Sequence, residues 1–433
     1  MLPFFSKVFE KIVSLRIIEF LEDNNLFYCN QFGFRKKHST NHAIITLVEK
    51  VSKALDTGKI VVGVFLDLKK AFDTVNHEIL LNKLKLYGIR GTVHDWLISY
   101  LNDRSQYVHY NGYNSEKKCI THGVPQGSIL GPLLFILYIN DFSKCSNLLF
   151  AILFADDTSV FIEGTNYDKM IDILNVELEH IDMWLRANKL TINIKKTHFM
   201  IFHRTRIKHK TRDVTIRGSS LSCTNHTKFL GVIIDNKLNW AEHILYIKNK
   251  IAKSIGIIHK TRSFLNKHTL RNLYFTFVYP YLIYCVEIWG NTNDIHLKPI
   301  VKMQKKSLRA ITFSHYLDST APLFKSQNIL NFRKLVTQRI ALLMFKYHTG
   351  LLPSPVSSLF TLNNERHNYN TRQSQDLQTN LGRGEHVYKL FSFHGVYIWN
   401  QLSKKIQTDV SYACFKNLSR KYLQINDISY RIR

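Results

Sequence analysis

The stretch IVVGVFLDLKKAFD, residues 60–73, decides the fold. Residues 60–66 are apolar and rich in β-branched side chains, a pattern typical of a strand that is buried on both faces. Asp67 follows directly, where an apolar core rejects an ionised carboxylate unless a positive charge compensates for its desolvation. The stretch therefore predicts a buried strand that carries a carboxylate at its end.

Two more carboxylates interrupt a second apolar stretch. Residues 148–153 and 159–162 are apolar and flank Asp156 and Asp157, which predicts a β-hairpin with both acids at its bend. One strand-end aspartate alone is more often a turn or cap residue, but two adjacent aspartates inside an apolar stretch fit that interpretation less well. If the strands are neighbours, the carboxylates converge, and two Mg²⁺ ions held there can clamp an in-line phosphoryl displacement.

The charge balance points to a polyanionic partner. The chain has 433 residues, with 59 Lys and Arg against 32 Asp and Glu and a formal net charge of +27. Self-repulsion of this size favours a partner that screens it, nucleic acid first and an anionic membrane surface second. The longest apolar stretch, residues 275–286, is too short to cross a bilayer, so we expect no membrane partner. None of the six cysteines forms a C-x-x-C pair, which predicts free thiols rather than a zinc ribbon or disulfide framework.

Secondary-structure patterns change near residue 240. Before it, helical and strand patterns alternate, and residues 228–235 are expected to form one strand; beyond it, helical patterns dominate and acids become rare. We therefore expect a mixed α/β body over 1–238, a basic helical region over 239–295 and a helical, basic nucleic-acid-binding region over 296–433. The basic candidates for phosphate contact are Lys248, Lys250, Lys253, Lys302, Lys305, Lys306 and Arg309. For any single stripe, a solvated basic face is an equally ordinary interpretation.

Three motifs resemble those of reverse transcriptases, and they occur in the right order. FLDLKKAFD (65–73) resembles the first palm motif, GVPQGSILGP (123–132) the second, and FADD (154–157) the aspartate box. Further segments match non-LTR (LINE-type), jockey-like retrotransposon polymerases: QFGFRKKHST (31–40), residues 185–197 with Asn193 and Lys196, and FLGVIID (229–235). The chain is therefore identified as a member of that family.

The resemblance implies both a fold and a reaction. The implied fold is an α/β (α+β) right-hand polymerase palm with partial fingers, followed by a helical thumb and a helical C-terminal region. The implied activity is RNA-directed DNA polymerisation, with Asp67, Asp156 and Asp157 as catalytic metal ligands for two Mg²⁺ ions, or Mn²⁺ in their place. The implied partners are an RNA template, a DNA primer or target and dNTPs. The oligomeric state stays open, and both nucleus and cytoplasm fit.

The resemblance also implies roles around the incoming nucleotide. Phe72 would lie under the sugar, where its ring excludes a ribose 2′-hydroxyl, and its ordinary alternative is core packing. Gln126 and Gly127 would line the nucleotide pocket, and their alternative is an ordinary turn. Arg35 or Lys36 would meet the triphosphate, and Lys196 would protonate pyrophosphate. The alternative for these three is an ordinary surface charge. The residues implied to brace the primer end are Phe229, Leu230, Gly231 and Val232.

Departures from the family pattern leave an alternative open. No endonuclease domain precedes the motifs, and residues 2–10 resemble the middle of a fingers motif, so we expect an N-terminally truncated polymerase fragment. No Cys/His knuckle is found in the tail. The alternative is a catalytically inactive nucleic-acid-binding remnant of such an element; a group II intron maturase or a telomerase subunit is a weaker one.

Overall fold

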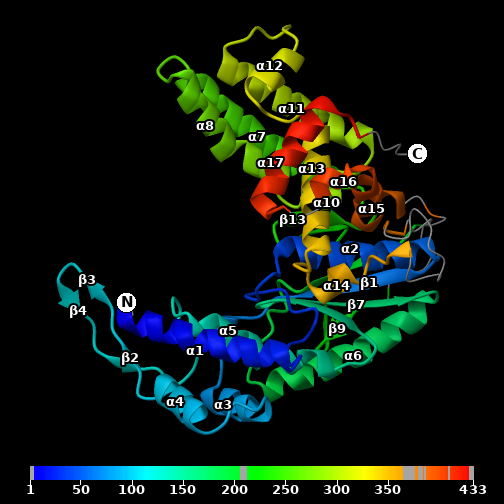
Figure 1. The fold of residues 1–433 in the computed structure, drawn as a ribbon. Coiled ribbons are helices and arrows are strands. Elements are labelled where there is room, and N and C mark those ends of the chain that lie inside the picture. Colours follow the sequence, from blue (N-terminus) through cyan, green and yellow to red (C-terminus); the bar gives the residue numbers. More distant parts are fainter. Residues whose placement is uncertain are drawn as a thin grey trace. The chain divides into compact units, whose positions relative to one another are not determined.

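The chain folds into two compact units in the computed structural model, which describes residues 4–204, 212–363, 376–378, 384, 387–407 and 410–428 (Figure 1). The first unit comprises Met1–Ser39, Ile60–Ile201 and Thr205–Thr224. The second comprises Thr40–Lys59, Phe202–Arg204 and Asn225–Arg433.

A five-stranded sheet with the order β11-β8-β1-β7-β6 lies at the centre of the first unit. Its middle strand β1 (Ile60–Leu66) pairs antiparallel with β7 (Asp157–Gly164), which pairs antiparallel with β6 (Phe150–Phe154). Residues 61–66 of β1 are all buried, as expected for a strand covered on both faces. The parallel pair β8 (His198–Phe202) and β11 (Ser222–Cys223) completes the sheet.

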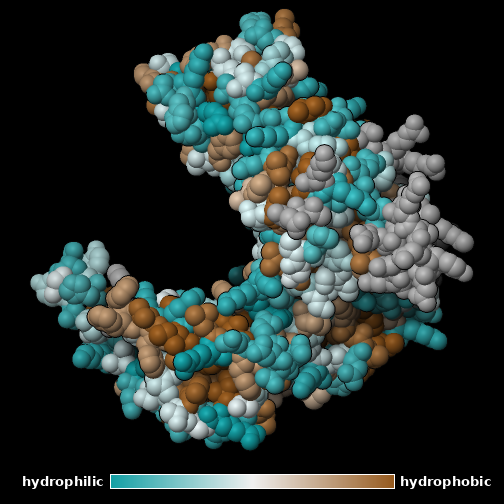
Figure 2. All heavy atoms as spheres, viewed as in Figure 1, coloured by the Kyte–Doolittle hydropathy of each residue, from teal (hydrophilic) through white to brown (hydrophobic). Residues whose placement is uncertain are grey.

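Helices cover this sheet with apolar faces. α5 (Leu130–Tyr138) is apolar along its length and almost wholly buried, and α6 (Tyr167–Ala187) turns Ile171, Leu174 and Leu178 into the same core. The other elements of the first unit are α1 (Phe4–Asp23), η1 (Ala71–Asp73), α3 (His77–Leu86), α4 (Thr92–Leu101), α5 (Leu130–Tyr138), η2 (Asn140–Lys144), α6 (Tyr167–Ala187), and the short strands β2 (Ser105–Gln106), β3 (His109–Tyr110), β4 (Tyr113–Asn114), β5 (Lys118–Cys119), β9 (Thr215–Ile216) and β10 (Ser219–Ser220). Apolar side chains also gather on the surface over α1, where Phe4 and Phe5 are exposed (Figure 2).

Among its described residues, the second unit from residue 225 onward is helical apart from one hairpin. α7 and α8 pack along α11, while α15 and α17 pack along α13. Its elements are α2 (Thr40–Asp56), β12 (His226–Phe229), β13 (Val232–Asp235), α7 (Ala241–Thr261), α8 (Lys267–Phe277), α9 (Tyr279–Ile283), α10 (Val286–Trp289), α11 (Asp294–Thr312), α12 (Ala321–Ser326), α13 (Phe332–His348), α14 (Ser354–Ser357), η4 (Val387–Lys389), α15 (Phe391–Gln401), α16 (Lys404–Gln407) and α17 (Tyr412–Ile425). Side-chain caps begin several helices in both units: Asn76, Asn166, Asn266, Asn331 and Ser411. None of the described helices is both long and apolar enough to span a bilayer.

The expected fold class, a mixed α/β body followed by a helical remainder, is confirmed. The compact units, however, are not divided at residues 238 and 295. The boundary expected at residue 238 lies at 224/225. Residues 40–59 also belong to the second unit, where Glu49 of α2 accepts the backbone N–H and the hydroxyl of Ser392 at the start of α15. Residues 239–295 and 296–433 form one unit because α7 and α8 pack along α11.

The expected single strand over residues 228–235 is wrong. Phe229 pairs with Val232, and the chain reverses between them at Leu230 and Gly231, which have φ values of 46° and 85°. Two successive residues with positive φ form the turn that matches the twist of a two-residue hairpin, and glycine adopts this conformation without strain. An apolar run can therefore contain a turn, and in this run only the glycine indicates it.

Candidate active site

The middle of the sheet brings three carboxylates to one end. Leu66 pairs with Thr158, and Phe154 pairs with Asp157, so Asp67 continues beside the start of β7. Ala155 and Asp156 form the bend between β6 and β7. Asp67 is half-buried, whereas Asp156 and Asp157 are exposed. The structure thus places the three acids singled out in the sequence at the same end of two adjacent strand pairs, β1–β7 and β6–β7.

The electrostatics of these acids reflect their proximity. Although Asp157 is exposed as a whole residue, partial desolvation of its carboxyl raises the pKa of that group, and repulsion from Asp156 and then from Asp67 raises this pKa further. Each carboxylate therefore makes the charge on its neighbour more costly, and a bound cation would relieve that cost.

Asp67 is held by a turn that follows α6. Its backbone N–H donates to Thr197 Oγ1 at 3.2 Å, and its carbonyl oxygen accepts the Asn193 backbone N–H at 2.7 Å. The Asn193 side chain also donates from Nδ2 to Asp67 Oδ2 at 2.9 Å. Asn193 is thus a site residue to which the motif comparison gave no role, because the two partners are 126 positions apart in the sequence.

The bend that carries Asp156 is braced by the segment after α1. Ala155 has a φ of 55°, a conformation that is strained for a residue with a β-carbon. The fully buried Gln31 accepts the backbone N–H groups of Ala155 and Gly33 on its Oε1, at 3.2 and 2.8 Å. Phe32 donates its backbone N–H to Leu153 at 2.8 Å. This segment therefore extends the pairing of β6 and fixes the strained bend.

Phe72 and the second motif lie on paired segments. The Phe72 carbonyl oxygen accepts the Val124 backbone N–H at 2.9 Å. The half-buried Phe72 ring stacks on Phe135 with centroids 4.2 Å apart, so the core-packing interpretation holds for one face of the ring. Gln126 and Gly127 are exposed, and Gly127 has a φ of 84°, which explains the glycine by backbone conformation.

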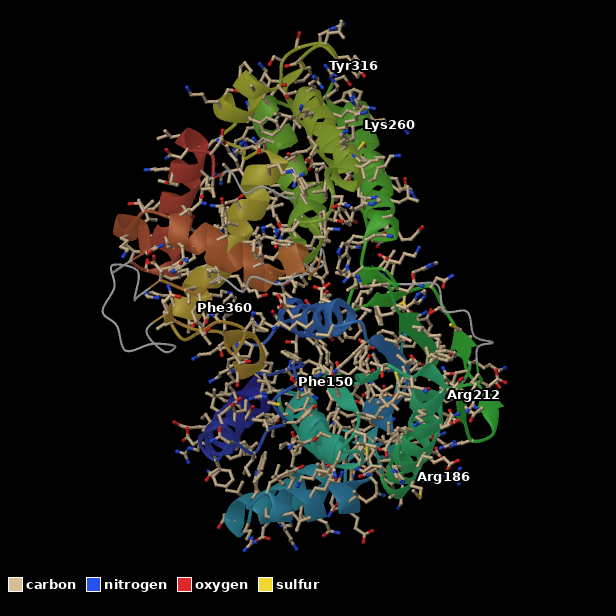
Figure 3. The ribbon with its side chains drawn as sticks, turned by 90° about the vertical axis from the view of Figure 1, so that its right-hand side faces the viewer. Phe150, Arg186, Arg212, Lys260, Tyr316 and Phe360 are labelled. Carbon is tan, nitrogen blue, oxygen red and sulfur yellow. The ribbon has the colours of Figure 1, made fainter. Side chains whose placement is uncertain are left out.

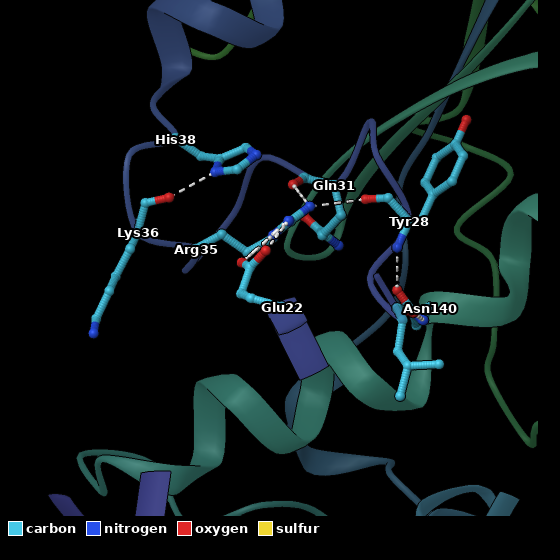
Figure 4. Close-up of polar contacts among 8 residues, drawn as sticks. Glu22, Tyr28, Gln31, Arg35, Lys36, His38 and Asn140 are labelled. Carbon is cyan, nitrogen blue, oxygen red and sulfur yellow. Dashed lines mark hydrogen bonds and ion pairs between the residues drawn. The ribbon is translucent and has the colours of Figure 1, made fainter. Parts of the chain in front are cut away.

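The structure separates the alternatives Arg35 and Lys36. Arg35 donates to both oxygens of Glu22, at 2.9 and 3.1 Å, and to the Tyr28 carbonyl at 3.0 Å (Figure 4). Lys36 is exposed and points away from this network (Figure 4). Because the Arg35 charge already serves an ion pair within the unit, Lys36 is the more accessible of the two cations.

Lys196 and the residues expected to brace a primer occupy two turns. Lys196 is exposed on the turn that holds Asp67. In the second unit, Phe229 and Val232 are buried, whereas Leu230 is half-buried and Gly231 is exposed at the bend between them. Tyr284 donates its hydroxyl to the Leu230 carbonyl at 2.7 Å and so fixes this bend.

The basic candidates lie on two packed helices of the second unit. α7 and α11 bury their apolar faces against each other, and α11 leaves Lys302, Lys305 and Lys306 exposed. On α7, Lys248 and Lys253 are exposed, and Lys260 lies further along the same helix (Figure 3). The half-buried Lys250 and Arg309 lie near the rings of Tyr246 and Tyr316.

Three arginines of the first unit are instead neutralised locally. Arg186 and Arg217 both pair with Asp182 of α6, at 2.7 and 2.5 Å, and Arg212 pairs with Asp168 and Asp172 of the same helix (Figure 3). The exposed lysines of α7 and α11 are therefore better candidates for phosphate contact than these arginines.

Asp67, Asp156 and Asp157 fit a divalent cation as a pair of ligands but not as a three-residue cluster. Among the described residues, no three His, Cys, Asp or Glu side chains are arranged to hold one ion. Mg²⁺, however, commonly takes only one or two protein carboxylates and completes its shell with water and substrate phosphates. A pair drawn from Asp67, Asp156 and Asp157 offers hard, charged oxygen ligands, and the mutual repulsion seen at Asp157 gives such a pair a reason to bind a cation.

Comparison with known proteins gives the family. Residues 1–234 match the family model described as reverse transcriptase (RNA-dependent DNA polymerase). The chain is 31% identical over 321 residues to the probable RNA-directed DNA polymerase from transposon X-element of Drosophila melanogaster, covering 72% of this chain and 35% of that protein. It is 30% identical over 322 residues to the RNA-directed DNA polymerase from mobile element jockey of Drosophila funebris, with coverage of 72% and 35%.

The chain spans about a third of the length of these curated relatives, whose matched share is 35%. Among solved structures, it is similar to telomerase from Candida tropicalis in complex with a fragment of telomeric RNA, with a TM-score of 0.41 and 10% identity over 95% of this chain and 56% of that chain. The sequence match covers more than half of the 433 residues, and the chain belongs to the reverse transcriptase (RNA-dependent DNA polymerase) family, in its jockey-like, non-LTR retrotransposon branch.

Proposed function

We propose that this chain is an RNA-directed DNA polymerase that adds deoxynucleotides to the 3′-hydroxyl of a primer on an RNA template. The observation that carries the proposal is the meeting of Asp67 with Asp156 and Asp157 at the end of β1 and the β6–β7 bend, in a chain of the reverse transcriptase family. Nucleotidyl transfer develops negative charge on the attacking and leaving oxygens, so an acidic site that collects divalent cations is the expected catalyst.

The proposed cation ligands are Asp67 and Asp156, with Asp157 as the third carboxylate. Two Mg²⁺ ions, or Mn²⁺ in their place, would supply Lewis acidity to the reacting oxygens when bound. The chain's own part is to hold these carboxylates in place. Asn193 fixes the Asp67 carboxylate through its Oδ2, and Gln31 fixes the bend that carries Asp156.

The proposed substrates are dNTPs on a primer and template. Phe72, Gln126 and Gly127 would contact the nucleotide, Lys36 rather than Arg35 its triphosphate, and Lys196 the departing pyrophosphate. The support for Phe72 and Gln126 is that their segments are joined by the hydrogen bond between the Val124 N–H and the Phe72 carbonyl. In the second unit, the Leu230–Gly231 bend would brace the primer, and the exposed lysines of α7 and α11 would contact phosphates.

Primer extension by the purified chain tests the proposal. With poly(rA) as template, oligo(dT) as primer, dTTP and Mg²⁺, we expect a ladder of extended primers, and a second reaction with Mn²⁺ reports the choice of ion. Extension that is lost when the primer ends in a dideoxynucleotide shows that the 3′-hydroxyl is the nucleophile. Salt-sensitive RNA binding without extension in either ion would contradict the proposal and would support the catalytically inactive nucleic-acid-binding remnant.

A further inference from the structure

α1 exposes an apolar face on the side that does not meet the core of the first unit. Ile17 and Leu21 of this helix are buried in that core, yet Phe5, Phe9 and Ile12 are 83%, 50% and 48% exposed. A surface helix normally turns polar side chains to solvent, and a helix that is apolar all round is normally buried. Figure 2 shows apolar side chains gathered over α1, and an exposed patch of this kind indicates an interaction surface.

A groove lies between α1 and α4 on this face. It encloses about 410 Å³, and its second wall comes from α4 and the loop before it, so both walls belong to the first unit. Trp96 of α4 meets Phe9 of α1 edge-on, with ring centroids 5.3 Å apart. The lining positions on α1 recur every three or four residues over about 16 Å of helix, which suits a partner helix that lies along the groove. These positions are Phe9, Ile12, Val13, Arg16, Ile17 and Phe20.

The charged side chains at the groove are cationic. Arg16 lines it from α1 and Arg90 from the loop before α4, and none of the described residues that line it is an acid. Both arginines are exposed, and a guanidinium stays charged at every physiological pH. Arg90 donates from Nε to the Lys85 carbonyl at 3.4 Å, a contact that does not neutralise its charge. Glu19, one turn beyond Arg16, is exposed and lies outside the groove lining.

These charges select among the occupants that an apolar groove could take. A second copy of this chain would bring its own net charge of +27 toward Arg16 and Arg90, so repulsion opposes its docking. A wholly apolar segment would cover both guanidinium groups without offering them an acceptor, which is costly. A nucleic acid would offer phosphates but no aliphatic surface for Ile12 and Val93 to pack against. An amphipathic helix with carboxylates beside its apolar stripe meets both requirements.

We infer that the groove between α1 and α4 is a docking site for an acidic amphipathic helix of another protein. Apolar side chains at positions i, i+3 or i+4, and i+7 of that helix would pack against Phe9, Ile12 and Trp96. Carboxylates beside them would accept hydrogen bonds from Arg16 and Arg90, and two parallel bonds to one guanidinium would fix the position of the helix along the groove. The groove uses none of the residues proposed for polymerisation, so a failure here leaves the proposed function untouched.

Binding of a designed peptide by the full chain tests the docking site. The probe is a fluorescent peptide of about 16 residues, about 24 Å of helix, with leucines along one stripe and glutamates on both sides of it. A scrambled peptide has the same composition and charge but no stripe, so it measures the attraction of any acidic peptide to this basic chain. We expect fluorescence anisotropy to show that the amphipathic peptide binds at least about tenfold more tightly, because only its leucines can be buried together in the groove.

Three variants separate the groove from the rest of the surface. Arg16→Gln with Arg90→Gln should weaken binding of the amphipathic peptide by about twofold to thirtyfold, the worth of two exposed charge pairs. Ile12→Asp places a carboxylate among the leucines and should weaken binding by more than about tenfold. Because Ile12 is exposed, the fold should tolerate this change, and thermal unfolding checks that it does. Lys7→Gln with Lys11→Gln is the matched control, since it removes two exposed charges of α1 that do not line the groove, and it should keep the parental affinity.

Equal affinities for the two peptides would overturn the inference. So would groove variants that bind the amphipathic peptide as tightly as the lysine control does. Analytical ultracentrifugation of the chain without peptide tests the second copy as occupant. A concentration-dependent dimer that Ile12→Asp dissociates would assign the groove to a second copy and overturn the inference, whereas a chain whose association state Ile12→Asp leaves unchanged supports a partner of another kind.

Discussion

At the scale of single residues, Asp157 is a carboxylate whose ionisation destabilises the fold. Its pKa is raised by partial burial and by repulsion from Asp156 and Asp67. A raised pKa in the folded state means that ionisation destabilises the fold, so stability is lost as the pH rises through that pKa. Functional sites commonly carry such a cost because the same repulsion favours a cation.

Asp157→Asn should therefore unfold at a higher temperature than the unaltered chain at pH 7 without added metal. The advantage should shrink as the pH falls toward about 4, where the aspartate takes up a proton in the unfolded chain as well. Thermal unfolding at both pH values measures this, with Asp95→Asn as the control that removes an exposed charge elsewhere. A lower unfolding temperature for Asp157→Asn at pH 7, or a gain that does not depend on pH, would contradict the electrostatic account.

Phe72 combines core packing with its proposed role at the sugar. Its ring stacks on Phe135 and meets Phe34 edge-on, with centroids 4.2 and 6.2 Å away. Overpacking a rigid site costs about 1–3 kcal/mol, so the ring should disfavour ribonucleotides by about 5- to 150-fold. Phe72→Val should remove most of that preference, with a smaller loss of dNTP use, and should lower stability by about 1 kcal/mol through the lost stacking. The ratio of dTTP to UTP incorporation measures the first effect.

Phe34→Leu provides the comparison for Phe72→Val, because it removes a ring from the same aromatic contact, leaves the Phe72 ring in place and puts no β-branched residue at the positive φ of position 34. It should lower stability slightly and keep the preference for deoxynucleotides. An unchanged preference in Phe72→Val would mean that the ring serves packing alone.

At the scale of elements, the fixed relation between the segment after α1 and the β6–β7 hairpin positions Asp156. The two are in backbone contact, because a β-carbon at Gly33 would lie 2.3 Å from the Ala155 nitrogen and 2.9 Å from the Phe154 carbonyl carbon. No flexible side chain can relieve such a clash, so one backbone must move. The β6–β7 bend and its brace therefore behave as one element.

Gly33→Ala should destabilise the fold by about 1–3 kcal/mol and lower primer extension, because the bend that carries Asp156 is displaced. Gly256→Ala is the matched control. Gly256 lies inside α7 with open space around its added β-carbon, so this substitution should stabilise the chain by about 0.5–1 kcal/mol. Chemical denaturation of both variants measures the two effects, and a Gly33→Ala chain as stable and active as the parent would refute the brace.

Local patterns predict elements well and their partners poorly. The run ending at Asp67 and the acids inside the second apolar stretch are local signals, and both lead to the observed strand and hairpin. The hydrogen bond of Asn193 to Asp67 and the grouping of α2 with the second unit depend on contacts between distant segments. The ion pair of Arg35 with Glu22 is equally hard to predict, because it depends on how the loop after α1 packs against that helix. Residue spacing carries no signal for such contacts.

At the scale of the whole molecule, a net charge of +27 is distributed unevenly. Arginines of the first unit pair with acids of α6, whereas α11 presents Lys302, Lys305 and Lys306 to solvent. Unpaired surface cations of this kind release counterions when they meet phosphates, so they set the salt dependence of nucleic-acid binding.

Replacing Lys302, Lys305 and Lys306 by Gln should weaken RNA binding and flatten its salt dependence. Each lost phosphate contact lowers the log–log slope by about 0.7–0.9, so a decrease of about 2 is expected. The same number of exposed lysines changed to Gln in the first unit, at Lys7, Lys11 and Lys85, is the matched control and should leave the slope almost unchanged. Equal slopes for the two triple variants would show that α11 does not contact the RNA.

The central claim is that Asp67, Asp156 and Asp157 form the catalytic centre of an RNA-directed DNA polymerase. It is tested most directly by comparing primer extension on an RNA template by the unaltered chain, Asp156→Asn and Asp95→Asn. The account predicts that Asp156→Asn, which removes one charge from the exposed bend, extends at least about 1,000-fold more slowly, because metal-borne charge stabilisation is worth several kcal/mol. Asp95→Asn should extend at the parental rate, and the RNA affinity of all three chains should agree within about twofold. Extension by Asp156→Asn at the parental rate would contradict the account.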